Sequence, residues 1–337
     1  MSIRHTAFVS VIYMQPINQN LTLQKKLELI DISSWPSGNQ RFVPIGKRIK
    51  KVVIHPTNFT LHYFKEPKEK YPWEFWNEII AYEVGKKLGF NVLEYCPAIL
   101  DGLGGCLSPS MTNGYTEDLM HGQQLLIRIL PEFETKKGTD HTFQLVEDYF
   151  NSEPAYTPLL KDFIEMLVFD SIIGNRDRHQ QNWALIREIH FKNSFFGIKK
   201  KKQVFLNVTS RFSPLFDNGN CLAYNVVEEN IDNYLNNNQV LEKYLFGEKA
   251  VSHLKWFGGS LTHIDLLKKI QEKHPDPVNQ AILRVREKYS ENLILGLVND
   301  VDNGIIFANN IYCLTPKRKE LIIKLIKIRT EKLLENF

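Results

Sequence analysis

Cysteines are few in this sequence, and none has the spacing of a metal site. The four cysteines, Cys96, Cys106, Cys221 and Cys313, lie far apart, without a Cys-x-x-Cys pair. A zinc site built on such pairs and a disulfide-rich framework are therefore not indicated. We expect a soluble protein whose thiols stay reduced.

Long apolar runs are also missing. No segment approaches the roughly 20 apolar residues that span a bilayer. The N-terminus, MSIRHTAFVSVIYMQP, lacks a long apolar stretch followed by a small-residue cleavage site. We therefore expect no transmembrane segment and a cytoplasmic location, or else export as a translocated or secreted effector without an ordinary signal peptide.

The charges of the two signs nearly balance. Lys and Arg number 42 against 38 Asp and Glu, which gives a net charge of +4. Direct nucleic-acid binding is not expected, because such proteins usually carry a strongly basic surface. The lysine-rich stretches 47–51 and 199–202 are typical of solvated loops. For 199–202, contact with an anionic lipid headgroup is the alternative.

The composition is that of a globular protein, with 43% apolar and 24% charged residues. Residues 1–133 contain one helix-type segment, PWEFWNEIIAYEVGKKLGF, among short β-type segments broken by Pro, Gly and Asn. These β-type segments are AFVSVIY, KLELIDI, KKVVIHP, FTLHYFK and QQLLIRIL.

Helical patterns dominate from about residue 140. They occupy 158–175, 262–274, 276–298 and 315–337. The sequence therefore predicts an α+β, two-lobed, protein-kinase-like fold, with a strand-rich N-lobe at 1–133 and a helical C-lobe at 134–337.

The segment FDSIIGNRDRHQQNWALI, residues 169–186, crowds polar side chains directly after an apolar helix pattern. Asp177 and Asn182 lie five positions apart in it. In kinases, an Asp accepts the proton of the incoming hydroxyl and an Asn five positions later binds Mg²⁺. Taken alone, Asp and Asn after a helix are more often turn residues that bond their own backbone.

A second carboxylate follows at Asp217, in RFSPLFDNGNCL. Mg²⁺ in proteins is usually held by one or two carboxylates together with phosphate oxygens. An apolar segment followed by Asp and then Gly resembles the Asp-Phe-Gly element of kinases, with Asn218 in place of Phe. An ordinary Asp-Asn-Gly turn is the alternative.

Lys65 and Glu78 supply the remaining groups. Strand alternation places Phe59, Leu61 and Tyr63 on the face that Lys65 continues, where a lysine needs a partner or a ligand. Alternatively, Lys65 extends its ammonium into solvent from the end of the strand. Kinases pair a strand Lys with a helix Glu against ATP phosphates. The order Lys, Glu, Asp-x₄-Asn, Asp-x-Gly is far more specific than any single member, and it favours a phosphotransferase.

Together these segments resemble the catalytic and metal-binding segments of the HipA-like Ser/Thr kinases. IIGNRDRHQQNWAL and SPLFDNGNCL are similar to the family patterns G-N-x-D-R-H-x-x-N-W and (A/S)-P-(L/I)-F-D-x-G. Within the family, the chain looks closest to the stand-alone CtkA-type members. The resemblance covers about residues 37–225, and the D-R-H-x-x-N core also occurs in phosphatidylinositol kinases.

The resemblance implies a role for each motif residue. The catalytic residues would be Asp177 as the base and His179 near the transferred phosphoryl group. The metal ligands would be Asn182 and Asp217. The ATP-binding residues would be the Lys65 and Glu78 ion pair, Ser37, Gly38 and Gln40 of the phosphate loop SGNQ, and Ile129 and Glu132 in the adenine-binding segment between the lobes.

Three features depart from the family pattern. The phosphate loop has a single glycine, Gly38, and Gly46 marks a rival location. The connection from Asn182 to Asp217 is long, with a lysine-rich insertion that we expect to form a loop. The N-terminal subdomain of some full-length members is not evident in residues 1–36.

The resemblance implies an ATP- and Mg²⁺-dependent Ser/Thr protein kinase that also phosphorylates itself. Its expected partners are ATP and a protein with a Ser or Thr hydroxyl. By the same resemblance, a role as a bacterial toxin or effector with an antitoxin partner is expected. The alternatives are a phosphoinositide-type lipid kinase, a nucleotide-binding pseudokinase and a toxin-antitoxin binding module.

Overall fold

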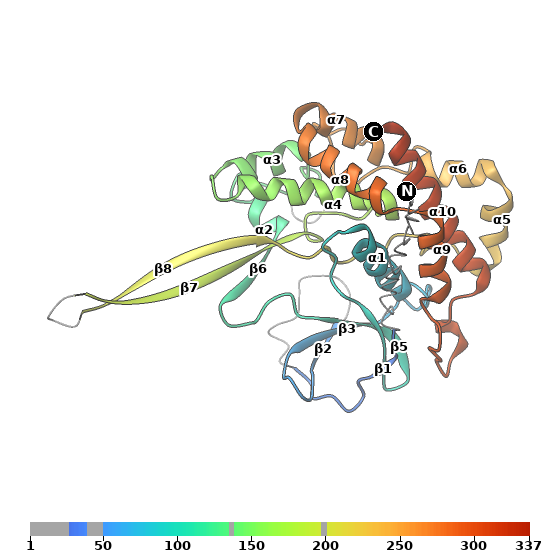
Figure 1. Ribbon diagram of the computed structural model, residues 1–337, viewed down its shortest axis with the longest axis horizontal. Helices are drawn as coiled ribbons and strands as arrows, with labels where there is room; N and C mark the ends of the chain where they lie inside the picture. Colours follow the sequence, from blue (N-terminus) through green and yellow to red (C-terminus); the bar gives the residue numbers. More distant parts are fainter. Residues whose placement is uncertain (1–26, 39–49, 135–137, 197–200) are drawn as a thin grey trace, which may run out of the picture.

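The computed structural model describes residues 27–38, 50–134, 138–196 and 201–337 and shows an α+β fold. A sheet-rich N-terminal region lies below a group of helices in the view of Figure 1. The predicted fold class is therefore confirmed. No helix in the described part of the chain is both long enough and apolar enough to cross a membrane.

Five strands form the N-terminal sheet, in the order β1-β4-β5-β3-β2. They are β1 (Ile30–Asp31), β2 (Lys50–Ile54), β3 (Leu61–Lys65), β4 (Cys96–Leu100) and β5 (Leu103–Pro109). β1 pairs with β4 in parallel, and the other neighbours are antiparallel. The register of the β2–β3 hairpin sets Lys50 opposite Lys65, so two lysines lie side by side at one end of this sheet.

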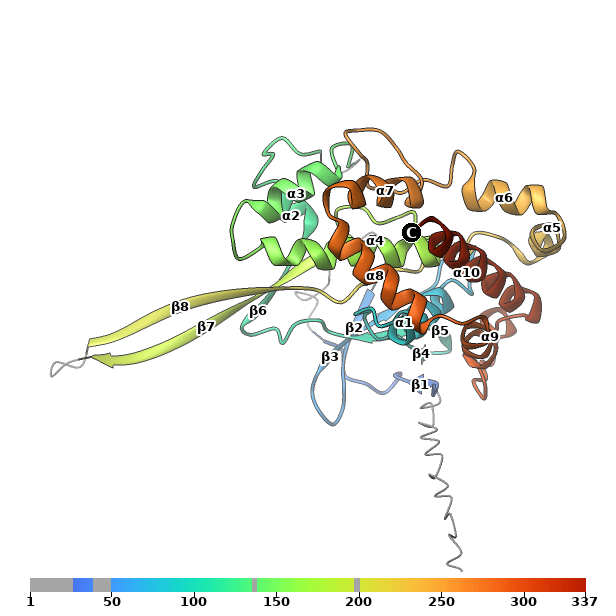
Figure 2. The ribbon, with the colours of Figure 1, turned by 45° about the horizontal axis from the view of Figure 1, so that its top comes forward.

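Helix α1 (Phe75–Leu88) confirms the helix predicted in the N-terminal part. It ends at Gly89, whose φ of 83° is left-handed and suits glycine. α1 packs against β4 and β5 on one side and against α8 and α9 on the other, as Figure 2 shows. Because α1 is covered on both sides, Glu78 is fully buried, with 0% exposure. A carboxylate in such a position needs a partner.

A second sheet has the order β6-β7-β8, from β6 (Glu117–His121), β7 (Ala184–Phe196) and β8 (Lys201–Phe212). β7 and β8 form a long hairpin that projects away from the body in both views (Figures 1 and 2). Most of the connection between Asn182 and Asp217 is therefore strand, while residues 197–200, which include the first lysines of the predicted loop, lie outside the described residues. The segments flanking the lysines are rich in aromatic and β-branched residues, which favour strands.

Helix α2 (Gly122–Leu126) replaces the strand predicted for QQLLIRIL. A capping box between His121 and Gln124 starts it. Leu125 and Leu126 are buried in the core. A short apolar run does not distinguish a strand from a buried helix, and here the cap decides. The lobe boundary between residues 133 and 134 stays a prediction, while β6, before it, pairs with β7, after it.

The remaining helices gather in the C-terminal part. They are α3 (Phe143–Asn151), α4 (Leu160–Ile173), α5 (Ile231–Asn236), α6 (Asn238–Phe246), α7 (His263–Lys273), α8 (Pro275–Lys288), α9 (Glu291–Asp300) and α10 (Pro316–Asn336). α4 is the central one and packs against α7, α8 and α10. The single segment predicted at 276–298 is two helices, because Ser290 caps α9 by accepting a hydrogen bond from the Leu293 amide at 3.2 Å.

Candidate functional site

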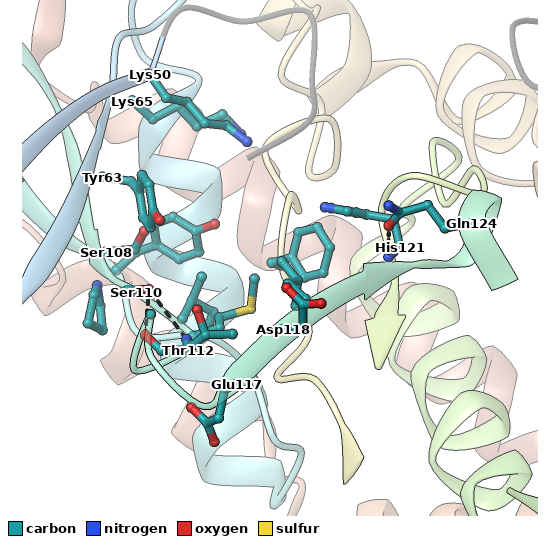
Figure 3. Close-up of a pocket in the computed structure, with 17 residues that line it drawn as sticks. Lys50, Tyr63, Lys65, Ser108, Ser110, Thr112, Glu117, Asp118, His121 and Gln124 are labelled. Atoms are coloured by element: carbon teal, nitrogen blue, oxygen red, sulfur yellow. Dashed lines mark hydrogen bonds between the residues drawn. The ribbon is translucent and has the colours of Figure 1, made fainter. Parts of the chain in front are cut away.

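A cavity of about 280 Å³ opens between the N-terminal sheet, β6 and the segment that leads to Asp217. Figure 3 shows the side chains of Lys50 and Lys65 extending into it in parallel, with Asp118 of β6 across from them. Apolar side chains line part of the cavity: Leu93, Met111, Leu119 and Phe216. An apolar cavity with a few converging charges is the usual form of a small-molecule site.

Lys65 is the charged centre of this cavity. It is 4% exposed, and its Nζ pairs with Glu78 of α1 and with Asp217, whose Oδ1 lies at 2.6 Å. The Lys65–Glu78 pair predicted from the sequence is thus present in the structure. One buried ammonium balances two carboxylates that come from distant parts of the chain.

The backbone around Asp217 explains why glycine follows two residues later. Asp217 has a φ of 57°, a left-handed conformation that Asp tolerates better than most residues. The Asn218 amide donates to Oε2 of Glu78 at 2.7 Å. A β-carbon on Gly219 would lie 2.4 Å from Oε1 of Glu74. The Asp-Asn-Gly turn therefore packs closely against the carboxylates of Glu74, which precedes α1, and Glu78 of α1, and only glycine leaves enough space.

The loop after α4 holds Asp177 and Asn182 together. Gly174 ends α4 with a φ of 68°, and the Asp177 amide donates to Oδ1 of Asn175 at 3.0 Å. Nδ2 of Asn182 donates to the Asp177 carbonyl at 2.8 Å. Since a carbonyl only accepts, the amide nitrogen of Asn182 must face it. The amide oxygen of Asn182 then points away from the loop backbone.

Asn220 is hydrogen-bonded to the Asp177 carboxylate. The sequence analysis did not predict it as a site residue. Its Nδ2 donates to Oδ2 of Asp177, and its Oδ1 accepts from Nζ of Lys68 at 3.0 Å. Asn220 lies three positions after the predicted metal ligand Asp217. This closeness in the sequence was the one signal that could have identified it. Asn220 thus couples the two predicted motifs.

Arg178, which received no role from the sequence, joins three segments of the site. It is 1% exposed and donates to both carboxylate oxygens of Asp170, at 2.9 and 2.7 Å. Further donations reach three oxygens, the carbonyls of Asn182 (2.8 Å) and Phe216 (2.6 Å) and Oδ1 of Asn218 (2.7 Å). The guanidinium therefore binds α4, the Asp177 loop and the Asp217 turn into one unit.

His179 lies on the Asp177 loop, but it is not among the residues that line the 280 Å³ cavity. Its amide donates to the Asp177 carbonyl at 2.8 Å, and its Nδ1 accepts from the Gln181 amide at 3.2 Å. Its ring meets the edge of His253 at 5.8 Å. These contacts fix the imidazole, while its role at the phosphoryl group stays a prediction.

The predicted phosphate loop is described only in part. Ser37 forms a β-bridge with Val53, and the Gly38 amide donates to the Val52 carbonyl at 2.8 Å. Both run along β2 and do not line the cavity. Gln40 and the rival Gly46 lie outside the described residues, so the location of the phosphate loop stays a prediction.

The predicted adenine-binding segment does not line the cavity either. Ile129, 36% exposed, and Glu132 lie in turns after α2. The positions that line this side of the cavity instead are Ser108–Thr112 and Glu117–Leu119. The strand expected before this segment is helix α2, and the role of Ile129 and Glu132 at the adenine stays a prediction.

Two further lining residues were missed, Lys50 and His121. Lys50 belonged to a lysine-rich stretch interpreted as a solvated loop, yet the hairpin register brings it beside Lys65. Burial lowers the pKa of His121, whose Nδ1 lies 2.8 Å from the Gln181 carbonyl. A neutral imidazole therefore lines the cavity on the side of α2.

The donor set beside the cavity suits a hard divalent cation. The amide oxygen of Asn182 and the Asp217 carboxylate are both oxygen donors, the type that Mg²⁺ prefers. No cluster of three or more His, Cys, Asp or Glu side chains placed to bind a metal occurs among the described residues. Mg²⁺ bound with a nucleotide needs only one or two protein carboxylates, because phosphates and water complete its shell. These residues fit Mg²⁺ in that form.

No protein-family model and no curated protein matches the chain. Among solved structures, it is similar to the crystal structure of the Helicobacter pylori proinflammatory kinase CtkA. The TM-score is 0.71 at 18% identity, and the match covers 91% of this chain and 96% of that chain. The chain has the fold of CtkA. The CtkA-type resemblance predicted from the sequence is thereby confirmed in the fold.

The chain is also similar, more distantly, to the solved structure of HipA from Shewanella oneidensis in complex with HipB and its operator DNA. That match has a TM-score of 0.48 at 10% identity and covers 89% of this chain and 68% of the HipA chain. In this chain, Lys65 of β3 meets Glu78 of α1 and Asp217 beside the 280 Å³ cavity.

Proposed function

We propose that the chain is an ATP- and Mg²⁺-dependent protein kinase that transfers the γ-phosphoryl group to Ser or Thr hydroxyls, its own included. The main support is Lys65, which lines the cavity and pairs with Glu78 and with Asp217. Phe216, another lining residue, accepts at its carbonyl from Arg178 of the Asp177 loop. The shared fold with a kinase, CtkA, supports the reaction class.

The cavity offers different surfaces to the two ends of ATP. Leu93, Met111 and Phe216 form an apolar surface that suits the adenine ring. Lys50 and Lys65 are adjacent at the other side, where two ammonium groups attract a polyphosphate. We therefore assign the adenine to the side of Ser108–Leu119 and the phosphates to the lysines.

The chain's own residues do the positioning and the proton transfer. Asp177, held through Oδ2 by Asn220, is the base that accepts the proton of the attacking hydroxyl. Asn182 and Asp217 would hold Mg²⁺, and Lys65 neutralises phosphate charge. Bound Mg²⁺ supplies Lewis-acid neutralisation of charge on the phosphate oxygens. Arg178 keeps the two motifs at a constant separation, which is what positioning catalysis requires.

The test is label transfer from γ-³²P-labelled ATP with Mg²⁺, offered casein, phosphatidylinositol vesicles or nothing else. We expect label on casein and on the chain itself, with phosphoserine or phosphothreonine after acid hydrolysis. Asp217→Asn should lose the label. Asp148→Asn, which removes an exposed carboxylate on α3, is the matched control and should keep it.

The other outcomes discriminate between the alternatives. Label on the lipid alone would identify a phosphoinositide-type lipid kinase. ATP binding without label on any acceptor would identify a nucleotide-binding pseudokinase. The absence of both ATP binding and label would refute the whole proposal.

A further inference from the structure

Arg329 of α10 is buried beneath the Asp177 loop without a carboxylate partner. The residue is 6% exposed, and it forms no hydrogen bond or ion pair with any residue in the described part of the chain. The guanidinium lies directly against Gly174 at the end of α4, since a β-carbon there would come within 2.4 Å of its Cζ. A guanidinium that is 6% exposed and has no paired acceptor is unfavourable, because most of its lost hydration is not replaced.

The ionisable groups nearest to Arg329 do not compensate its charge. Burial lowers the pKa of Arg329 to about 10, so the guanidinium stays charged at neutral pH. Its ionisable neighbours are the Tyr244 phenol, the Arg176 guanidinium, the Cys221 thiol and the His263 imidazole. Burial raises the pKa of Cys221 well above its ordinary value, which keeps that thiol neutral. A second cation and three groups that are not carboxylates therefore lie near Arg329.

The guanidinium lines a small cavity together with the first turn of α7. Within the cavity, the centre of a water-sized sphere can occupy about 20 Å³. This space is enough for one water molecule or one monatomic ion. Thr262, His263 and Ile264 line it from the start of α7, and Ser171 lines it from α4.

The first turn of α7 is itself electropositive. Oγ1 of Thr262 caps the Asp265 amide at 3.2 Å, while the earlier amides of this 11-residue helix have no partner within the helix. The N-terminal end of a helix carries partial positive charge and favours anions. Two independent positive features, a helix N-terminus and an unpaired buried guanidinium, thus face one cavity.

We propose that this cavity binds one small monatomic anion of the chloride class, between the Arg329 guanidinium and the first turn of α7. A water molecule would supply hydrogen bonds but leave the charge uncompensated. The space open to the centre of a water-sized sphere, about 20 Å³, suits a single atom-sized ion better than a tetrahedral anion such as phosphate.

The site adjoins the Asp177 loop. Nε2 of His263 donates to the Asn175 carbonyl at 2.8 Å, and Oδ1 of Asn175 accepts from the Asp177 amide at 3.0 Å. An anion that orders the first turn of α7 and Arg329 therefore also steadies Gly174 and Asn175 at the start of the loop. The consequence for phosphoryl transfer rests on the proposed function, whereas anion binding does not.

The first test measures thermal unfolding of the full chain, without nucleotide, in sodium chloride, sodium bromide or sodium gluconate at equal ionic strength. Gluconate is too bulky for the cavity. We expect a halide-specific, saturable rise in Tm of roughly 2–4 °C at ten times the dissociation constant. Arg329→Met should lose the response. Lys327→Met, which removes a more exposed cation from the same helix, should keep it.

The second test locates the anion in the wild-type protein and does not depend on a variant that folds. Crystals prepared in sodium bromide should show an anomalous scattering peak between Arg329 and the first turn of α7. No peak there, equal Tm values in halide and gluconate, or a halide response that survives Arg329→Met would each overturn the proposal. Since neither test involves ATP, failure here is distinct from failure of the kinase assignment.

Discussion

Lys65 and Asp217 are 152 positions apart in the chain, yet Nζ of Lys65 lies 2.6 Å from Oδ1 of Asp217. The contact joins the end of strand β3 in the N-terminal sheet to the turn that follows the long β7–β8 hairpin. Glu78 of α1 shares the same ammonium. A strand, a helix and a turn are therefore held at one point by a single buried lysine.

Lys65→Met is expected to abolish phosphoryl transfer and to destabilise the fold. Removal of the ammonium leaves Glu78 buried without its counterion, at a cost of roughly 3–5 kcal/mol. In Lys65→Met with Glu78→Gln, stability should recover because the amide carries no charge, while transfer stays absent. Urea unfolding and label transfer on the same samples measure both effects. Recovery of transfer in the double variant would show that Lys65 has no direct role.

Arg178→Met should be among the most destabilising single substitutions. It leaves the Asp170 carboxylate, 1% exposed, without its partner and removes three further hydrogen bonds. We expect a loss of roughly 3–5 kcal/mol in the free energy of unfolding. Arg286→Met, at an exposed position of α8, should change it by about 0.5 kcal/mol or less. Similar urea midpoints for the two variants would contradict the joining role of Arg178.

Asn220→Ala should lower kcat and leave the KM for ATP nearly unchanged. Asn220 holds the Asp177 carboxylate and lines no part of the 280 Å³ cavity. Because a catalytic group displaced by about 1 Å loses up to 100-fold in rate, a fall of roughly 10- to 100-fold is expected. Asn299→Ala, at an exposed position of α9, serves as the control. A raised KM with unchanged kcat would instead place Asn220 in nucleotide binding.

His263 should make stability depend on acid pH. Burial lowers its pKa to about 4, the nearby Arg329 charge lowers it too, and the hydrogen bond to Asn175 opposes the fall. An unfolded histidine binds its proton near pH 6.5, so between about pH 6.5 and 4 the unfolded chain binds more protons. Stability from neutral His263 is therefore full above pH 6.5 and is lost as the pH falls toward 4.

His263→Gln keeps a donor for the Asn175 carbonyl but removes the titration. The free energy of unfolding of the wild type should fall by about 3 kcal/mol more than that of the variant between pH 7 and pH 4. Urea unfolding at pH 7, 5.5 and 4 measures the difference. Parallel pH profiles would show that His263 is not kept neutral by the fold.

The residues with chemistry of their own could be recognised from local patterns. Lys65 interrupts the apolar face of a strand, and Asp217 precedes a turn dipeptide. The fold class followed from the change of periodicity near residue 140. Such signals are short-range, so they survive without knowledge of which segments meet.

The supporting contacts could not be predicted in the same way. Arg178 acts on acceptors from α4, its own loop and the Asp217 turn, and no spacing reveals that convergence. Arg329 looks like one more cation of an amphipathic helix until the end of α4 is packed on it. QQLLIRIL became a helix through a cap formed by its flanking residues.

The central claim is that Asp177 serves the transfer step and not the binding of ATP. The most direct measurement compares wild type with Asp177→Asn in label transfer from γ-³²P-labelled ATP and in ATP affinity by calorimetry. We expect Asp177→Asn to lower label transfer by roughly 100-fold or more and to keep the ATP affinity within about threefold of the wild type. Transfer at the wild-type rate in Asp177→Asn would contradict it.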